Sequence, residues 1–191
     1  MLYLIRHGQT AQNQAKILQG RSDYPLNEAG LAQAKEAGRK FYENGISFQH
    51  IFSSPLQRAV RTAQLAAGEC TRILLDERLI EMNYGPYEGM SLVTPPPEVL
   101  EFFHDFVHAP VPEGMEPLES VVARMGSFLE EIRMHAEKEN VLISTHAIAM
   151  KGALEYLTPD SNGAYWSKHI RNCAIYAIPC EHGAFGLPFS Y

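Results

Sequence analysis

The stretch Met1-Leu2-Tyr3-Leu4-Ile5-Arg6-His7-Gly8-Gln9-Thr10 decides the fold of this chain. Its first five residues are mostly apolar, aromatic or β-branched, and this pattern predicts a buried strand. Arg6, His7 and Gly8 follow the strand directly, and in an open α/β sheet ligands bind just beyond the carboxyl ends of the strands. Arg6 offers a permanent charge with forked donors that suit an oxyanion. His7 offers a ring nitrogen that can act as nucleophile or base.

The bulk composition predicts one globular domain that spans residues 1–191. Of the 191 residues, 46% are hydrophobic, which is enough for a sizeable core. The formal net charge of −6 argues against general binding to nucleic acid or to a membrane surface. Any anion must therefore be bound by a local cluster of positive charge.

The cysteines and the first residues bear on the cellular compartment. Cys70, Cys173 and Cys180 match no zinc-binding spacing, and an odd number fits reduced thiols better than a disulfide framework. The predicted strand begins at Met1, which leaves no room for a signal peptide, and no apolar run is long enough to span a membrane. We therefore expect a cytoplasmic protein.

The first half of the chain predicts two helices separated by a short strand. Asn27 is a candidate N-cap for a helix that ends at Asn44-Gly45, and the apolar face of this helix contains Leu31, Ala34, Gly38, Phe41 and Tyr42. Residues 50–53 predict the strand. Ser54-Pro55-Leu56-Gln57 predicts the start of the next helix, with the serine as cap and the glutamine completing a capping box. Arg58 then lies in the first turn, near the end of the strand.

The second half continues the alternation of strands and helices. Residues 73–75 predict a strand, and residues 84–117 predict an irregular lid whose short helix has an apolar face of Leu100, Phe103, Phe106 and Val107. A long helix follows, with an apolar face of Leu118, Val121, Val122, Met125, Leu129, Ile132 and Ala136. Residues 141–145 predict a second buried strand, which ends in His146. With a helix over 147–156 and a strand over 174–178, we predict an α/β fold: a single three-layer domain, with a mostly parallel sheet flanked by helices.

Several sequence blocks occur in one order between residues 3 and 146. They are Leu4-Ile5-Arg6-His7-Gly8-Gln9-Thr10 with Asn13, Gln19-Gly20 with Asp23-Tyr24-Pro25-Leu26-Asn27-Glu28-Ala29-Gly30, Ser53-Ser54-Pro55-Leu56-Gln57-Arg58-Ala59 with Thr62-Ala63, Glu81 with Gly85 and Glu88-Gly89, and Ser144-Thr145-His146. In this order they resemble the signature blocks of the histidine phosphatase (phosphoglycerate mutase-like) superfamily.

The resemblance implies a role for each matching residue. His7 is implied as the nucleophile that becomes phosphorylated and Glu81 as the proton donor, within a catalytic set of His7, Glu81, Arg6, Arg58 and His146. The implied phosphate- and substrate-binding set is Arg6, His7, Asn13, Gln19, Gly20, Arg58, His146 and Ala147. The family needs no metal, so we expect no cofactor.

The chain departs from the family pattern in two places. Where relatives often carry Gly-Gly-Glu-Ser before the long helix, this chain has Glu113-Gly114-Met115-Glu116. Ala147 stands where the mutases of the family have glycine. Both departures concern specificity for the leaving group rather than the phosphate chemistry.

The implied chemistry explains why these residue types are needed. A phosphomonoester carries close to two negative charges, and Arg6 and Arg58 can neutralise them in forked geometry. His7 must attack through an unprotonated nitrogen, so its other nitrogen needs an acceptor such as a backbone carbonyl. Glu81 would protonate the leaving alkoxide and then take a proton from the water that cleaves the phosphohistidine.

Several alternatives stay open at this point. Glu77 or Glu88 could be the acid in place of Glu81, because all three lie close in the sequence. A metal site built from His7, His146 and Glu81 competes in principle, but the adjacent arginines would repel a cation. The remaining histidines are expected to be surface or structural residues: His50, His104, His108, His135, His169 and His182.

The composition of the lid narrows the substrate. Residues 79–123 contain no lysine or arginine but eight acidic residues, whereas the mutases bring basic residues from this region. We therefore predict a phosphomonoesterase for a small-molecule phosphate ester with a neutral or partly apolar leaving group. A cofactor-dependent phosphoglycerate mutase and a weakly active phospho-ligand-binding protein are the alternatives. The sequence leaves the oligomeric state open, with a homodimer among the alternatives.

Overall fold

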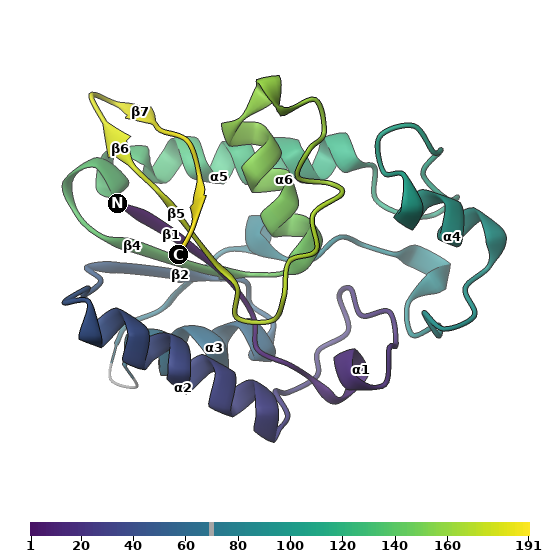
Figure 1. The fold of residues 1–191 in the computed structure, drawn as a ribbon, viewed down its shortest axis with the longest axis horizontal. Helices are drawn as coiled ribbons and strands as arrows, with labels where there is room; N and C mark the ends of the chain where they lie inside the picture. Colours follow the sequence, from purple (N-terminus) through teal and green to yellow (C-terminus); the bar gives the residue numbers. More distant parts are fainter. Residues whose placement is uncertain (69–70) are drawn as a thin grey trace.

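A six-stranded sheet forms the centre of the computed structural model, which describes residues 1–68 and 71–191 (Figure 1). Its strands are β1 (Leu2–Arg6), β2 (His50–Ser53), β3 (Leu74–Leu75), β4 (Val141–Thr145), β5 (Ile175–Ile178) and β8 (Phe189–Ser190). The spatial order is β3-β2-β4-β1-β5-β8. The first four pair in parallel, and β5 and β8 add an antiparallel edge. A separate hairpin joins β6 (Cys180–Glu181) and β7 (Ala184–Phe185).

Helices cover both faces of this sheet and confirm the predicted α/β fold. One pair is α2 (Glu28–Glu43) and α3 (Gln57–Ala67), and the other is α5 (Leu118–Lys138) and α6 (Ala147–Leu157). Figure 1 shows the two pairs on opposite sides of the strands. The shorter elements are α1 (Ala11–Gln14), α4 (Pro97–His104) and the 3₁₀ turns η1 (Glu77–Leu79), η2 (Gly85–Tyr87) and η3 (Pro159–Ser161).

The alternation of side chains along β1 divides the core between these layers. Leu2 and Leu4 pack into the cluster that includes α5 and α6, whereas Tyr3 and Ile5 pack into the cluster that includes α2 and α3. Successive side chains of a strand point to opposite faces, so a central strand covered on both sides must be apolar throughout. Burial of both faces therefore accounts for the opening run of the sequence.

The register of the two central strands determines where the polar residues meet. In the parallel pair β1–β4, Ile5 lies opposite Ser144 and Arg6 lies opposite Thr145. The next residue of each strand is a histidine, so His7 and His146 leave the same edge of the sheet as neighbours. This edge is the one at which ligands bind in open α/β sheets.

The start of α3 differs from the sequence prediction. The helix begins at Gln57 with Leu56 as its N-cap, and no side chain caps it from that position. Instead, Asp23 of a preceding loop accepts a hydrogen bond from the Gln57 N–H at 2.8 Å. The predicted capping box from Ser54 is thus wrong, because the serine hydroxyl is engaged with His146.

Two predicted apolar faces also need correction. In α2, which Asn27 caps as predicted, Tyr42 is 84% exposed, and the buried positions include Ala34, Ala37 and Phe41. In the lid segment, α4 ends at His104 and buries Val99 and Phe102, whereas Leu100 and, beyond the helix, Val107 are exposed. Phe103 and Phe106 pack against the core, so the prediction for this lid helix was right for these two residues and wrong for Leu100 and Val107. The long helix α5 buries most of its predicted face.

The cysteine and membrane predictions can be compared with the described residues. Cys173 and Cys180 carry free thiols, whereas Cys70 lies outside the described residues. Within residues 1–68 and 71–191, none of the helices has the length and apolar character needed to cross a membrane.

Candidate active site

The two histidines that follow β1 and β4 form the centre of the candidate site. The His7 N–H donates to the Thr145 carbonyl at 2.9 Å, which fixes the two strand ends against each other. The ring centroids of His7 and His146 lie 5.1 Å apart, and both side chains are buried. Two imidazoles from separate strands thus share one small volume at the edge of the sheet.

Hydrogen bonding and charge prepare His7 to act as a nucleophile. Its Nδ1 pairs with the Gly8 carbonyl at 2.7 Å, so Nδ1 carries the proton and Nε2 keeps its lone pair. Burial, followed by the charges of Arg6 and Arg58, holds the pKa of His7 well below its usual range. Gly8 itself packs so closely that an added Cβ would lie 2.5 Å from the Gly30 carbonyl oxygen.

Arg58 is fully buried in the first turn of α3. Its two terminal nitrogens donate to the carbonyls of Gly20 and Ser22, both at 2.6 Å. Burial lowers its pKa to about 10, although the carboxylates of Glu81 and Asp23 oppose the change. The guanidinium is therefore still charged at neutral pH, and the loop before α2 holds it in place.

Glu88 organises this loop. Its carboxylate accepts hydrogen bonds from the backbone N–H groups of Gly20, Arg21 and Ser22 and from the Ser22 hydroxyl. Gly20 leaves no room for a side chain, because an added Cβ would lie 2.6 Å from the Glu88 carboxylate. Glu88 thus fixes the Gly20 and Ser22 carbonyls that orient Arg58, and both of its carboxylate oxygens already accept hydrogen bonds from the loop.

Glu81 lies at the amino end of α6. Its carboxylate accepts hydrogen bonds from the N–H groups of Met82, Ile148 and Ala149 at 2.9–3.2 Å. The side chain is buried, and its charge acts on both Arg6 and Arg58. Of the two other acids considered from the sequence, Glu77 is exposed on η1 and Glu88 is bound to the loop. Glu81 is therefore the candidate acid best placed near the two arginines.

Ser54 is a site residue that the sequence analysis missed. Its hydroxyl lies 2.7 Å from His146 Nε2, at the end of β2. Burial, followed by the charges of Arg58 and Arg6, holds the pKa of His146 well below its usual range. A serine directly after a predicted strand could have been assigned to the site, but the following proline made it look like a helix cap.

Arg6 lines two cavities. One has a volume of about 510 Å³ and is lined by Arg6, Asn13, Lys16 and Arg171 among others. The other has a volume of about 280 Å³ and is lined by Arg6, Ala147, Lys151 and the lid residues Phe103 and Phe106, among others. Of the residues predicted to bind substrate, Asn13 and Ala147 therefore line open volume beside Arg6, whereas Gln19 and Gly20 line neither cavity.

Unpartnered polar atoms concentrate on the residues predicted to bind phosphate. In the described part of the chain, the buried side-chain atoms that lack a hydrogen-bond partner are Arg6 Nε, Gln19 Nε2, Arg58 Nε, Arg133 Nε, His146 Nδ1 and the Tyr191 hydroxyl. The first three and His146 Nδ1 belong to residues predicted to bind phosphate. Buried polar groups in folded proteins are nearly always paired, so these donors match the needs of an oxyanion.

The alternative of a metal site at His7, His146 and Glu81 receives no support from the geometry. Among residues 1–68 and 71–191, the trio of histidine and acidic side chains with ligand atoms close enough to share an ion is His50, His135 and Glu139. That trio lies at the other end of β2. The candidate active site instead combines buried imidazoles with guanidinium groups, which favours an anion.

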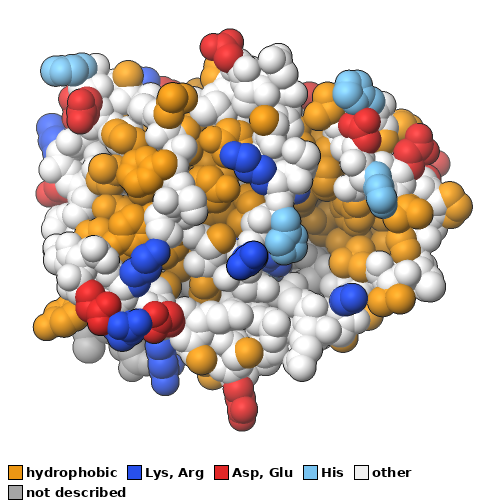
Figure 2. All heavy atoms as spheres, in the orientation of Figure 1, with side chains coloured by type: hydrophobic (Ala, Val, Ile, Leu, Met, Phe, Trp, Pro, Cys, Tyr) orange, Lys and Arg blue, Asp and Glu red, His pale blue; other side chains and the backbone are white. Residues whose placement is uncertain are grey.

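Basic side chains also line the wall that faces the lid. Lys151 of α6 is buried, donates from Nζ to the Trp166 carbonyl at 2.5 Å, and lies 4.7 Å from the centre of the Phe106 ring. Burial lowers its pKa to about 8. Lys168 and His169 line the same cavity. Figure 2 shows basic and histidine side chains beside a hollow on this face, which the hydrophobic side chains of the α4 segment border.

Comparison with known proteins places this arrangement among phosphate-handling proteins. Residues 2–188 match the family described as “Histidine phosphatase superfamily (branch 1)”. The chain is 34% identical over 184 residues to “Putative phosphoserine phosphatase 2” of Hydrogenobacter thermophilus, covering 94% of this chain and 89% of the relative. It is 33% identical over 180 residues to “Probable phosphoglycerate mutase GpmB” of Yersinia pestis, covering 91% and 82%.

Solved structures also superpose on nearly the whole chain. A variant of phosphoserine phosphatase from Entamoeba histolytica, in complex with phosphoserine, superposes with a TM-score of 0.82 at 25% identity, covering 99% of this chain and 93% of that one. Bacillus stearothermophilus YhfR superposes with a TM-score of 0.86 at 28% identity, covering 97% and 94%. The resemblance thus extends over the whole chain, lid segment included.

Proposed function

Because the chain belongs to branch 1 of the histidine phosphatase superfamily, we propose that it hydrolyses small phosphate monoesters through a phosphohistidine formed on His7. The observation that carries this proposal is the buried imidazole of His7, whose Nδ1 is bonded to the Gly8 carbonyl and whose pKa is lowered. These two conditions keep Nε2 unprotonated and available at neutral pH. An unprotonated nitrogen is what attack on phosphorus requires.

In the proposed first step, His7 Nε2 forms a bond to phosphorus and the bond from phosphorus to the ester oxygen breaks. Arg6, Arg58 and His146 donate hydrogen bonds to the phosphoryl oxygens as their charge grows, which lowers the barrier. Glu81 gives a proton to the leaving oxygen. The products of the step are a free alcohol and the phosphorylated imidazole.

In the second step, water attacks the phosphorus and the bond to Nε2 breaks. Glu81 takes a proton from the attacking water, which returns the carboxyl group to its starting state. The sum of the two steps is ester plus water giving alcohol plus inorganic phosphate. No metal ion enters either step, so we expect a chelator to leave turnover unchanged.

Turnover of p-nitrophenyl phosphate tests the nucleophile. His7→Ala should lower kcat by about a thousandfold or more, since it removes the atom that accepts the phosphoryl group. His108→Ala, which removes an exposed histidine from the lid segment, should leave kcat unchanged. A phosphoenzyme trapped in the native protein and absent from His7→Ala would support the intermediate. A native protein that binds phosphate without turnover would favour the phospho-ligand-binding alternative.

We further propose that the leaving group carries an acidic substituent. The lid itself contains no lysine or arginine, but Lys151, Lys168 and His169 line the facing wall of the cavity beside Arg6. A carboxylate placed there would meet positive charge, and this location differs from the basic lid typical of the mutases. The relative from Entamoeba histolytica has been solved with phosphoserine and with 3-phosphoglyceric acid, both of which carry carboxylates.

A substrate panel distinguishes the choices of leaving group. Phosphoserine and 3-phosphoglycerate should be hydrolysed with higher kcat/KM than glycerol phosphate, which lacks the carboxylate. A preference for uncharged esters would instead favour the apolar leaving group that the lid composition predicts. Efficient conversion of 3- to 2-phosphoglycerate that depends on the bisphosphate would overturn hydrolysis and identify a mutase.

A further inference from the structure

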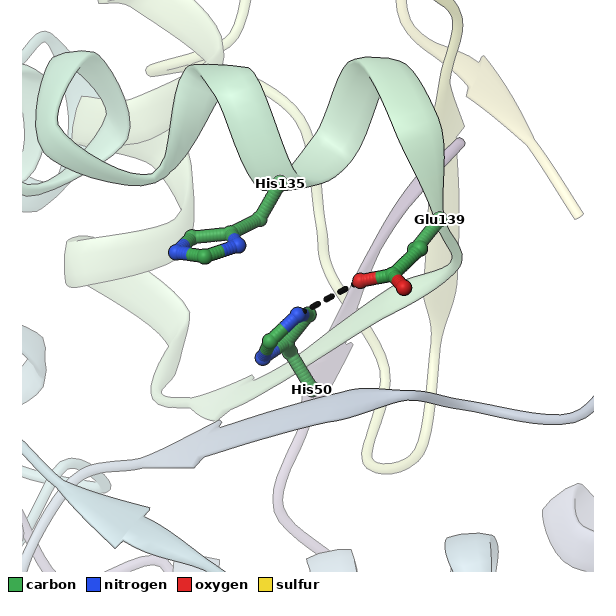
Figure 3. Close-up of side chains that lie close together, drawn as sticks. All are labelled: His50, His135 and Glu139. Carbon is green, nitrogen blue, oxygen red and sulfur yellow. Dashed lines mark hydrogen bonds and ion pairs between the residues drawn. The ribbon is translucent and has the colours of Figure 1, made fainter.

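Three side chains with metal-binding atoms meet at the end of the sheet opposite the candidate active site. His50 is the first residue of β2, His135 lies in the last turn of α5, and Glu139 is the residue that caps this helix. Figure 3 shows the three side chains directed toward one another from the strand and from the helix end. None of the three has a part in the proposed hydrolysis.

The distances among these groups suit a single ion. His50 Nε2 and the Glu139 carboxylate are 2.6 Å apart, and the two imidazole centroids are 4.2 Å apart. One ligand atom from each residue lies within 4.8 Å of the others. Ligand atoms around tetrahedral zinc stand about 3.3–3.6 Å apart, given metal–ligand bonds of about 2.0–2.2 Å. Modest rotations of exposed side chains would therefore complete the geometry.

The ion pair between His50 and Glu139 accounts for only part of this cluster. His135 contributes a second imidazole, and its spacing of four residues from Glu139 places both on the same side of the helix end. Two imidazoles and one carboxylate form a ligand set that binds zinc with a remaining position for water. An ion pair between His50 and Glu139 does not require a second imidazole beside it, so the position of His135 supports a metal site.

The electrostatic surroundings contain contributions of both signs. The carboxyl end of α5 carries the negative end of the helix dipole, which favours a cation. Lys138 is exposed in the same turn, and the Met1 amino group donates to the Ala136 and Glu139 carbonyls. These two positive charges oppose the binding of a cation. The Glu139 side chain is 44% exposed and that of His50 is 27% exposed. Such a site should bind an ion with moderate rather than very high affinity.

We propose that His50, His135 and Glu139 form a surface site for a divalent zinc ion. The ion would link the end of α5 to the start of β2 and stabilise the folded chain, because the unfolded chain does not hold the three ligands together. The imidazole and carboxylate donors favour zinc over magnesium or calcium, which prefer all-oxygen sites. The ion has no part in the chemistry at the opposite end of the strands.

Calorimetric titration of the full chain with zinc chloride tests this site. We expect one zinc ion per chain and an affinity that falls about tenfold or more in His135→Ala, which removes an exposed ligand. His108→Ala is the matched control, because it removes another exposed histidine that has its own carboxylate partner, Asp105. This variant should bind zinc as the native chain does.

Thermal unfolding gives a second measurement. Zinc should raise the Tm of the native chain and of His108→Ala, whereas the Tm of His135→Ala should respond little. Turnover of p-nitrophenyl phosphate by His135→Ala, without added zinc, should match that of the native protein. Zinc binding of equal strength in His135→Ala, or no saturable binding by the native chain, would overturn the proposal and leave an ordinary ion pair.

Discussion

We propose that the Ser54 hydroxyl selects the nitrogen of His146 that carries a proton. Ser54 Oγ accepts from the Leu56 N–H at 3.4 Å and lies 2.7 Å from His146 Nε2, to which the hydroxyl can donate. The imidazole proton then lies on Nδ1, the atom without a partner among the described residues. His146 is thereby prepared to donate to a phosphoryl oxygen.

Ser54→Ala should lower kcat/KM by about tenfold and weaken inhibition by phosphate, because the imidazole could then adopt the other tautomer. Steady-state kinetics with phosphate as inhibitor measures both effects. Ser144→Ala is the matched control: it is also buried, but its hydroxyl donates to the Ala59 carbonyl and not to an imidazole. Equal phosphate inhibition in the native chain and Ser54→Ala would contradict this role.

Glu81→Gln should affect substrates according to their leaving groups. An alkyl phosphate needs a proton on its leaving oxygen, so its kcat should fall by about 10²–10⁴-fold. p-Nitrophenolate leaves without such help, so the first step with p-nitrophenyl phosphate should fall less, as single-turnover release of nitrophenol would measure. Glu77→Gln serves as control because Glu77 is exposed. Equal losses for both substrates would point to another acid.

The sequence predicted most of the candidate site at this scale, because the local motifs contain the reactive atoms themselves. His7, Arg58 and His146 lie at strand ends or in a first helical turn that the hydrophobic pattern already indicates. Ser54 was misassigned because helix capping and hydrogen bonding to a distant imidazole use the same small polar residue. Only the fold shows which partner it has.

At the scale of elements, the loop over residues 20–22 connects Glu88 to Arg58. Glu88→Gln would replace one acceptor oxygen by an amide nitrogen, so one or more loop N–H groups would lose a partner. The free energy of unfolding should fall by about 1–3 kcal/mol. Phosphate inhibition should weaken as well, because the Gly20 and Ser22 carbonyls would no longer hold the guanidinium.

Urea unfolding and phosphate inhibition measure the two consequences of Glu88→Gln. Glu98→Gln is the control, since Glu98 accepts one hydrogen bond from the Tyr87 hydroxyl at an exposed position of the same region. A variant with lower stability and unchanged phosphate inhibition would show that the loop does not position Arg58.

The elements themselves were predictable where one periodicity dominates. The strands over β1 and β4 and the helix α5 follow from continuous or helical apolar patterns. The lid helix α4 does not, because Val99, Leu100, Phe102 and Phe103 offer two overlapping faces. Contacts with the rest of the core decide that Val99 and Phe102 are buried. Such a choice depends on tertiary packing and not on the local sequence.

At the scale of the whole molecule, the two buried histidines make stability depend on pH. Burial, with the nearby arginines, lowers the pKa of both His7 and His146. Below about pH 6.5 the unfolded chain takes up a proton on each, whereas the folded chain does not. The free energy of unfolding should therefore fall with decreasing pH, by up to about 1.4 kcal/mol per pH unit for each histidine. Above that pH neither the folded nor the unfolded chain binds these protons, so the two histidines no longer lower the free energy of unfolding.

Urea unfolding in phosphate-free buffers between about pH 5 and 7.5 measures this slope. His146→Ala should reduce the slope by the share of one buried histidine. An unchanged slope in His146→Ala would mean that other groups govern the acid sensitivity.

The candidate active site is formed by segments 6–8, 20–22, 54–58 and 146–149, which are spread over three quarters of the polypeptide. No excised peptide or half-molecule would reconstitute it. Enzymatic turnover should consequently report renaturation of the complete chain, because activity requires all of these segments to be in place together.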